Sequence, residues 1–193
     1  VPKPSDKSWN ALSLPWMAYG YGVSLTPLQT LTFYNAIANN GEMVRPKFVK
    51  EIRTQTNSVS TFSKEVIDPK ICSQETIDKV KKMMEDVVIR GTAANIYDEN
   101  FSMAGKTGTC QTDYWKGDGV KYIATFVGYF PAENPMYSCI VIIHKPNKSI
   151  GYYGNAVSAP VFKKIAHKIY AQTPSEQELI LANNVSAIDK KFE

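Results

Sequence analysis

The stretch best suited to chemistry is Gly105-Lys106-Thr107-Gly108-Thr109, which combines one cation with two glycines and two β-branched hydroxyl residues. Threonine favours an extended backbone, and glycine leaves room for the close approach of another backbone or a ligand. A strand at this place offers an ammonium group, two hydroxyls and bare backbone N–H groups. Such a set is suited to holding an anionic, peptide-like ligand.

Taken alone, this stretch has two other interpretations. Gly-Lys-Thr also closes the phosphate-binding P-loop, but that motif needs a glycine where this sequence has Asn100, and a helix directly afterwards. Gly108 and the threonines predict a strand instead, which argues against a P-loop. A glycine- and threonine-rich strand without any chemical role stays open until the flanking segments are considered.

The composition is that of an ordinary soluble globular domain. The 193 residues are 44% hydrophobic and 21% charged, which is enough apolar sequence for a buried core. The net charge of +4 is spread along the chain. Its densest basic cluster, Lys79, Lys81 and Lys82, lies beside Glu85 and Asp86 on a predicted helix. This favours a solvated helix face, and nucleic acid is not an expected partner.

Cysteine and histidine give no sign of a metal or disulfide framework. Cys72, Cys110 and Cys139 are an odd number without a CxxC spacing, and His144 and His167 each stand alone. Paired spacings are typical of zinc sites and of disulfide-rich domains. We therefore expect no metal and no cofactor.

The first residue, Val1, is not a methionine, and the segment that follows is loop-like. The sequence contains no apolar stretch long enough to cross a bilayer and no signal peptide. We expect the chain to be a piece of a longer protein, so the missing targeting signals carry no information about its location.

The clearest element is a helix over residues 27–39. Thr26 is its predicted N-cap, Pro27 takes the first helical position, and Gln29 completes a capping box. Gly41 is a natural stop signal.

Other elements follow from periodicity and from turn residues. We expect irregular structure over 1–25, a two-stranded excursion at about 47–54 and 58–63, a helix beginning after Ser73, and a final helix from near Ser158 and Pro160 to about Ala171. Between the last two helices, strands are predicted at 104–112, 122–130 and 136–144, joined by turns at 113–121 and 131–135. Short turns indicate an antiparallel meander. The fold class is therefore α+β, with a three-stranded antiparallel sheet packed against helices.

The sequence around the lysine resembles a known family. K-T-G, together with S-x-x-K and an S-x-N type of triplet, is the signature of penicillin-binding proteins and class A β-lactamases. The flanking segments resemble class B penicillin-binding proteins in register over about residues 9–171. These segments are Tyr19–Gln29, Ala36–Gly41, Arg45-Pro46, Phe126–Pro131, Tyr153-Gly154 and Ala159–Phe162.

The resemblance implies a partial β-lactamase/transpeptidase-like fold. No serine in the chain is followed by lysine three positions later, and Ser8-Trp9-Asn10 lies too close to the Tyr-Gly-Tyr-Gly stretch to be the family's second motif. We expect residues 1–171 to be the C-terminal portion of a transpeptidase domain without its nucleophile segment. Residues 172–193 are expected to be a polar linker or tail.

The resemblance also implies roles for the central stretch. In this family a serine is acylated by the D-Ala-D-Ala end of a peptidoglycan stem peptide, and an amine of a second stem then takes the acyl group. Lys106 would hold the S-x-N motif and favour the substrate's anion. Gly108 with the hydroxyls of Thr107 and Thr109 would bind the terminal carboxylate, and the backbone N–H of Thr109 would be an oxyanion-hole donor.

The cellular setting is likewise implied by the resemblance. The parent would be anchored in the inner membrane with this domain in the periplasm, and would bind stem peptides, β-lactams and membrane proteins of cell division or elongation. The strands carrying Cys110 and Cys139 would flank the strand between them, so free, mostly buried thiols are expected. A D-Ala-D-Ala carboxypeptidase, a β-lactamase or a non-catalytic β-lactam-sensing or scaffold module of the same fold remain alternatives.

Overall fold

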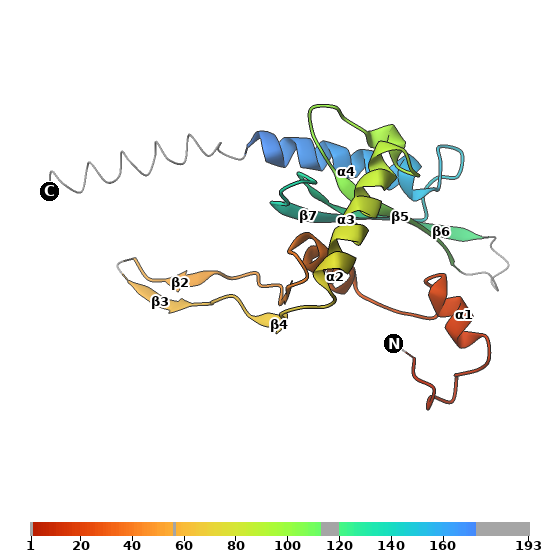
Figure 1. Cartoon of the computed structure of the whole chain (residues 1–193), viewed down its shortest axis with the longest axis horizontal. Coiled ribbons are helices and arrows are strands. Elements are labelled where there is room, and N and C mark those ends of the chain that lie inside the picture. The colour runs from red at the N-terminus through yellow and green to blue at the C-terminus, as the bar shows by residue number, and fades with distance from the viewer. Residues whose placement is uncertain (1, 56, 113–119, 173–193) are drawn as a thin grey trace, which may run out of the picture. The chain divides into compact units, whose positions relative to one another are not determined.

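A computed structural model describes residues 2–55, 57–112 and 120–172 (Figure 1). The chain divides between Ser73 and Gln74 into two compact units. No helix in the described part of the chain is long and apolar enough to cross a membrane. The turn predicted at 113–121 lies outside the described residues except for its last two positions, and the predicted tail lies outside them except for Gln172.

The first unit contains the helix with the clearest start signal. Helix α2 spans Pro27–Ala38, within one residue of the prediction. The backbone N–H of Gln29 donates to Thr26 Oγ1 at 3.2 Å, and the backbone N–H of Thr26 donates to Gln29 Oε1 at 2.9 Å. This reciprocal pair is the expected capping box.

The prediction of irregular structure over residues 1–25 is wrong in one place. Helix α1 spans Ser13–Ala18, and it has no side-chain N-cap that the sequence could reveal. Its end is well defined, because the N–H groups of Tyr21 and Gly20 donate to the carbonyls of Trp16 and Met17, at 3.0 and 2.9 Å. With Gly20 at a φ of 87° this is a Schellman motif, so the glycine was the available signal.

Two pairs of short strands complete the first unit. Strands β2 (Glu51–Arg53) and β3 (Ser58–Thr61) form the expected antiparallel excursion, although each is shorter than predicted. A second antiparallel pair, β1 (Met43–Val44) with β4 (Val66–Asp68), was not predicted. Strands of two or three residues are too short to show an alternating pattern in the sequence. In addition, β1 and β4 are separated in the chain by the whole β2–β3 excursion.

The second unit consists of two long helices and a three-stranded sheet. Helix α3 (Gln74–Ile89) and the 3-10 turn η1 (Ala94–Ile96) precede strands β5 (Ala104–Thr112), β6 (Lys121–Phe130) and β7 (Tyr137–His144), and helix α4 (Gly154–Ala171) follows. The strands run antiparallel in the order β5-β6-β7. The predicted meander is confirmed.

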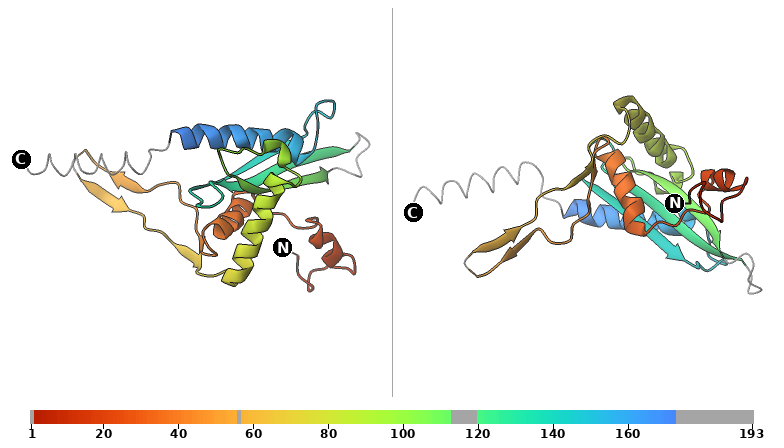
Figure 2. Two further views of the ribbon diagram at one scale, coloured as in Figure 1. Left: turned by 45° about the horizontal axis from the view of Figure 1, so that its top comes forward. Right: turned by 90° about the horizontal axis from the view of Figure 1, so that it is seen from below.

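The sheet lies between the two helices. Figures 1 and 2 show α4 along one face and α3 crossing the other. On the α4 face the ring centroid of Phe162 lies 4.8 Å from that of Phe126 and 5.7 Å from that of Phe130. All three side chains are completely buried. These aromatic contacts fix α4 against the central strand.

Helix α4 begins earlier than predicted. It starts at Gly154, and Pro160 lies inside it rather than at its first position. Tertiary contacts set this start, because the Gly154 N–H donates to Thr109 Oγ1 at 3.1 Å and the buried Ser158 hydroxyl donates to the carbonyl of Ala124 at 3.0 Å. Local sequence signals do not contain either contact.

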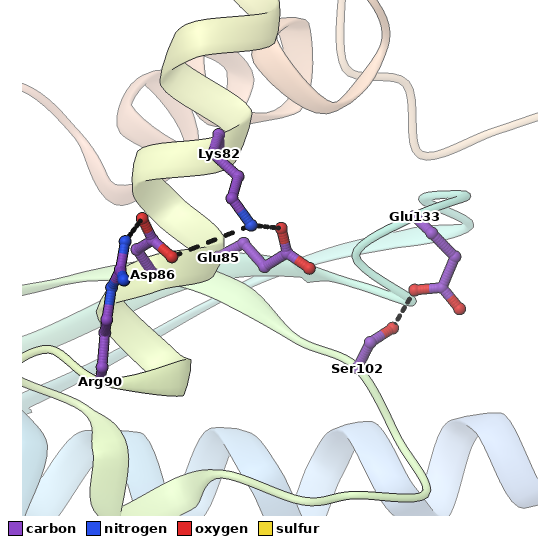
Figure 3. A network of polar contacts seen from close by, with 6 residues as sticks. All are labelled: Lys82, Glu85, Asp86, Arg90, Ser102 and Glu133. Carbon is purple, nitrogen blue, oxygen red and sulfur yellow. Dashed lines mark hydrogen bonds and ion pairs between the residues drawn. The ribbon is translucent and has the colours of Figure 1, made fainter.

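The exposed side of α3 carries the cluster that the sequence analysis assigned to a solvated face. Figure 3 shows Lys82 between Glu85 and Asp86, and Arg90 against Asp86. Pairs of this kind, one helical turn apart in solvent, add only a few tenths of a kcal/mol each, roughly 0.3–0.5. Figure 3 also shows Ser102 donating to Glu133, a contact that joins the segment before β5 to the turn after β6.

All three cysteines are free thiols, as expected. Cys110 on β5 and Cys139 on β7 are separated by β6, which confirms the assumed strand order. Both are half-buried rather than mostly buried. This partial burial raises the pKa of each thiol, which makes the reactive thiolate scarcer.

Gly128→Ala should destabilise the second unit strongly. A Cβ at Gly128 would lie 2.2 Å from the carbonyl oxygen of Ala104 and 3.0 Å from Cα of Gly105, and backbone atoms cannot rotate away. Overpacking typically costs about 1–3 kcal/mol, and a clash with backbone atoms lies at the upper end of that range. Gly108→Ala is the matched control on β5, because its Cβ would meet only Thr125 Cβ at 3.6 Å. Equal melting temperatures for the two variants would contradict this packing.

Tyr129→Phe should raise the free energy of unfolding. Tyr129 is completely buried, and among the described residues its hydroxyl has no hydrogen-bond partner. Burial, with a smaller contribution from the Glu85 carboxylate, raises its pKa to about 12. Removing an unsatisfied buried hydroxyl recovers about 1 kcal/mol. Tyr122→Phe removes a hydroxyl that accepts a hydrogen bond from Gln111 and should not stabilise; the reverse order in urea denaturation would refute the assignment.

Candidate functional site on strand β5

Strand β5 carries the whole central stretch at an edge of the sheet. Among the described strands it pairs only with β6, so its second edge has no described partner. An exposed strand edge is a template for pairing with an extended peptide. The strand predicted at 104–112 is confirmed with the same bounds.

The motif is divided between the two faces of the strand. Side chains alternate along a strand, so Thr107 and Thr109 share one face and Lys106 lies on the other. Thr107 and Thr109 stand opposite Phe126 and Ala124, on the face that α4 covers. A ligand that lies along the edge can therefore meet the ammonium from one side and the hydroxyls from the other.

Thr109 lies directly at the N-terminus of α4. Its hydroxyl oxygen accepts the hydrogen bond from the first N–H of the helix, that of Gly154. A Cβ on Gly154 would stand 2.4 Å from the carbonyl oxygen of Thr125 and 2.8 Å from that of Gly108, so only glycine permits this approach. The positive end of the dipole of an 18-residue helix thus lies next to this hydroxyl.

Thr107 has a partner from another part of the chain. Its hydroxyl oxygen lies 3.0 Å from that of Thr92, in the turn that follows α3. Thr92 and Thr109 are exposed and Thr107 is half-buried, so solvent and ligands reach this group. The sequence analysis did not identify Thr92 or Gly154 as site residues, because neither contact can be read from local spacing.

The Lys106 ammonium lies against its own strand. Its Nζ donates to the carbonyl of Thr107 at 2.7 Å, and the side chain is exposed. The four predicted site residues, Lys106, Thr107, Gly108 and Thr109, are therefore all together on β5. Their individual roles remain predictions.

The two glycines of the central stretch, Gly105 and Gly108, are present for different structural reasons. A Cβ on Gly105 would lie 2.5 Å from the ring of Phe126, so this position is required by internal packing. At Gly108 the nearest atom to such a Cβ is an ordinary 3.6 Å away. Gly108 is therefore not demanded by packing within the described residues, and its bare backbone is consistent with an approaching ligand.

A cluster of tyrosines that was not predicted from the sequence borders the site. Tyr122 stacks on Tyr152 with ring centroids 4.2 Å apart. The ring centroid of Tyr152 lies 4.4 Å from that of Tyr153, the residue directly before Gly154. The Tyr152 hydroxyl donates to that of Tyr153 at 3.1 Å. This hydrogen bond raises the pKa of Tyr152. Two consecutive tyrosines directly before Gly154 were the feature of the sequence from which this cluster could have been predicted.

A half-buried carboxylate, that of Asp98, ties α4 to the segment before β5. Asp98 lies 3.0 Å from Lys163 Nζ and 3.3 Å from His167 Nε2, and accepts the Asn100 N–H at 3.0 Å. The hydrogen bond from Lys163 is the main reason why the pKa of Asp98 is lowered. The Lys163 ammonium also donates to the carbonyl of Tyr97 at 3.0 Å, so this clamp holds the connector in place.

No group of three histidine, cysteine or acidic side chains in the described ranges comes together in a way that could hold a metal ion. The site itself offers the hydroxyls of Thr107 and Thr109, the ammonium of Lys106 and the backbone N–H groups of β5. These are groups that bind an anion.

Comparison with known proteins identifies the family. A family model described as the penicillin-binding protein transpeptidase domain matches residues 3–167. The chain belongs to this family. The resemblance drawn from the K-T-G stretch and its neighbours is therefore confirmed, and so is the α+β fold class.

Relatives and solved structures agree with this assignment. Peptidoglycan D,D-transpeptidase FtsI of Buchnera aphidicola (subspecies Baizongia pistaciae) is 34% identical over 88% of the chain and 28% of its own length. Stage V sporulation protein D of Bacillus subtilis is 30% identical over 91% of the chain and 26% of its own length. The transpeptidase domain of Burkholderia pseudomallei penicillin-binding protein 3 aligns with a TM-score of 0.67 and 30% identity, over 86% of the chain and 48% of that structure. The chain thus spans little more than a quarter of the length of these two curated relatives.

Asp98→Asn should lower stability at neutral pH and leave it unchanged in acid. The folded pKa of Asp98 lies below its ordinary value of 3.8, so the clamp stabilises the fold above that value and is lost as the pH falls through the folded pKa. The melting temperatures of wild type and variant should converge as the pH falls below 3.8 and through the folded pKa. Glu75→Gln breaks an exposed pair with Lys79 and is the control with little effect. A difference in melting temperature that does not shrink as the pH falls below 3.8 would contradict the electrostatic origin.

Proposed function

We propose that this chain supplies the substrate-binding surface of a serine-type peptidoglycan D,D-transpeptidase. The observation that carries the proposal is the placement of two threonine hydroxyls and a lysine on an open strand edge, beside the N-terminus of a long helix. The family assignment and the names of the relatives support it.

The reaction divides into two acyl transfers. A serine oxygen attacks the carbonyl between the two D-alanines of a stem peptide, the C–N bond breaks, and the terminal D-alanine leaves with the proton. The amine of a second stem peptide then attacks the acyl-serine, forms the cross-link and returns a proton to the serine. A β-lactam carries an equivalent carbonyl and acylates the same serine.

In this scheme β5 holds the substrate. The hydroxyls of Thr107 and Thr109 bind its terminal carboxylate, and the helix dipole behind Thr109 favours that negative charge. Lys106 adds a positive charge and holds the neighbouring serine motif. Gly108 allows the peptide backbone to lie against the strand. In support, packing within the described residues does not require a glycine at this position.

The backbone N–H of Thr109 is proposed as an oxyanion-hole donor. A donor fixed on a strand needs no reorganisation when negative charge develops on the carbonyl oxygen. One such donor is typically worth about 3–4 kcal/mol of transition-state stabilisation. The second donor belongs to the reacting serine, which is not found in this chain with the S-x-x-K spacing.

The cellular setting follows from the same proposal. The parent protein is anchored in the cytoplasmic membrane, acts on its periplasmic face, and works with the membrane proteins of cell division or elongation. Its ligands are stem peptides and β-lactams. The FtsI name of one relative supports the division assignment, and the sporulation name of another shows how related domains are used in other settings.

A fluorescent penicillin tests this function. The chain alone should not be labelled, whereas a protein that joins it to a transpeptidase segment with S-x-x-K should be labelled covalently. In that protein Lys106→Ala should slow acylation by about 100-fold, a loss typical of a group that stabilises developing charge.

Lys79→Ala is the matched control, because Lys79 is an exposed lysine on α3 whose described ion pair is with Glu75. Its acylation rate should stay that of the wild type. Covalent labelling of the chain alone, or normal acylation by the Lys106 variant, would overturn the proposal.

A further inference from the structure

We infer that Thr92 is a positioning residue for the anion site: it fixes the hydroxyl of Thr107 so that Thr107 keeps its own proton for the ligand. This inference rests on the proposed function of β5. It assigns a role to a residue outside the K-T-G stretch, 15 positions earlier in the chain.

Thr92 stands on a rigid turn. At Gly91 a Cβ would lie 2.7 Å from Cα of Val87, so the chain folds back tightly against the end of α3. The Ala93 N–H then donates to the Val87 carbonyl at 2.9 Å. Ala93 and Ile96 are fully buried, at 0% and 1% exposure. The backbone on both sides of Thr92 is therefore fixed, while its side chain is exposed and turned to β5.

The contact is a hydroxyl-to-hydroxyl hydrogen bond of 3.0 Å, in which either oxygen can donate. A hydroxyl has one proton and can accept further hydrogen bonds. When Thr92 donates, the Thr107 oxygen is an acceptor on its inner side and its proton remains free to point at an anion. A carboxylate bound to Thr107 selects this direction, because a carboxylate only accepts.

Thr109 shows the same arrangement with no ambiguity. The Gly154 N–H can only donate, so Thr109 Oγ1 is the acceptor and keeps its own proton. Thr107 and Thr109 are alternate residues on one face of β5. Each is thus held by a group from another element, and each can present an O–H to the same ligand.

The two supporting elements are joined to each other. Asn95 Nδ2, in η1, donates to the carbonyl of Asn155 in the first turn of α4 at 2.9 Å. The turn with Thr92 and the helix end with Gly154 therefore move together. This contact holds the turn without touching either hydroxyl, and it provides a control for a merely structural role.

The experiment is an NMR titration of the chain with N-acetyl-D-Ala-D-Ala and with its C-terminal amide. Wild type should bind the carboxylate more tightly than the amide, and Thr92→Val should weaken carboxylate binding by about 5-fold, as expected for one hydrogen bond. Thr92→Ser keeps the hydroxyl and should bind like wild type. Amide binding should be the same in all variants.

A double-mutant cycle tests whether Thr92 acts through Thr107. In a Thr107→Val background, Thr92→Val should cause no further loss. Asn95→Ala should leave the preference for the carboxylate unchanged, because it alters the turn but not the hydroxyls. Additive losses in the cycle, an equal loss in Asn95→Ala, or a failure of Thr92→Ser to restore binding would overturn the inference.

The two proposals fail in different ways. If wild type binds the carboxylate and the amide equally, the proposed function of β5 is refuted, and the role of Thr92 falls with it. If wild type prefers the carboxylate and Thr92→Val keeps that preference in full, the role of Thr92 alone is refuted.

Discussion

The close seating of α4 on the sheet is the constraint on which the second unit depends. At Gly154 the helix begins directly over the carbonyls of Thr125 and Gly108, at a distance that excludes any side chain. The same approach gives Thr109 its N–H donor and places the helix dipole at the strand. Further along, Ser158 and Phe162 extend the contact across β6. One packing requirement thus determines both the core and the electrostatics of the candidate site.

Sequence signals located the elements whose causes are local. The helix α2, the threonine-rich strand β5 and the apolar strands β6 and β7 were predicted to within a residue or two, because capping residues, turn residues and strand-favouring residues can be read from neighbouring positions. The start of α4 was misplaced because Pro160 is a common first helical residue, whereas the actual start is fixed by contacts with β5 and β6.

The candidate site was predictable in its residues but not in its geometry. The K-T-G stretch and its neighbours identified the strand and the family. The division of Lys106 from the two hydroxyls follows from the alternation of side chains along a strand. The contacts from Thr92 and Gly154 depend on which elements pack against β5. The tyrosine cluster beside the site is also tertiary, since it joins β6 to the loop before α4. A motif therefore names the strand, while its surroundings determine how its groups are presented.

Gly105 and Gly108 illustrate a broader point about such motifs. Both glycines lie in strand β5, close to Lys106 and the two threonines. A Cβ on Gly105 would clash with the Phe126 ring, whereas a Cβ on Gly108 would meet no atom closer than an ordinary contact. The first glycine is a requirement of folding, and in our proposal the second is a requirement of the ligand. Under the proposed function, a substitution at Gly105 changes the amount of folded protein and a substitution at Gly108 changes ligand binding, although the two residues lie only three positions apart.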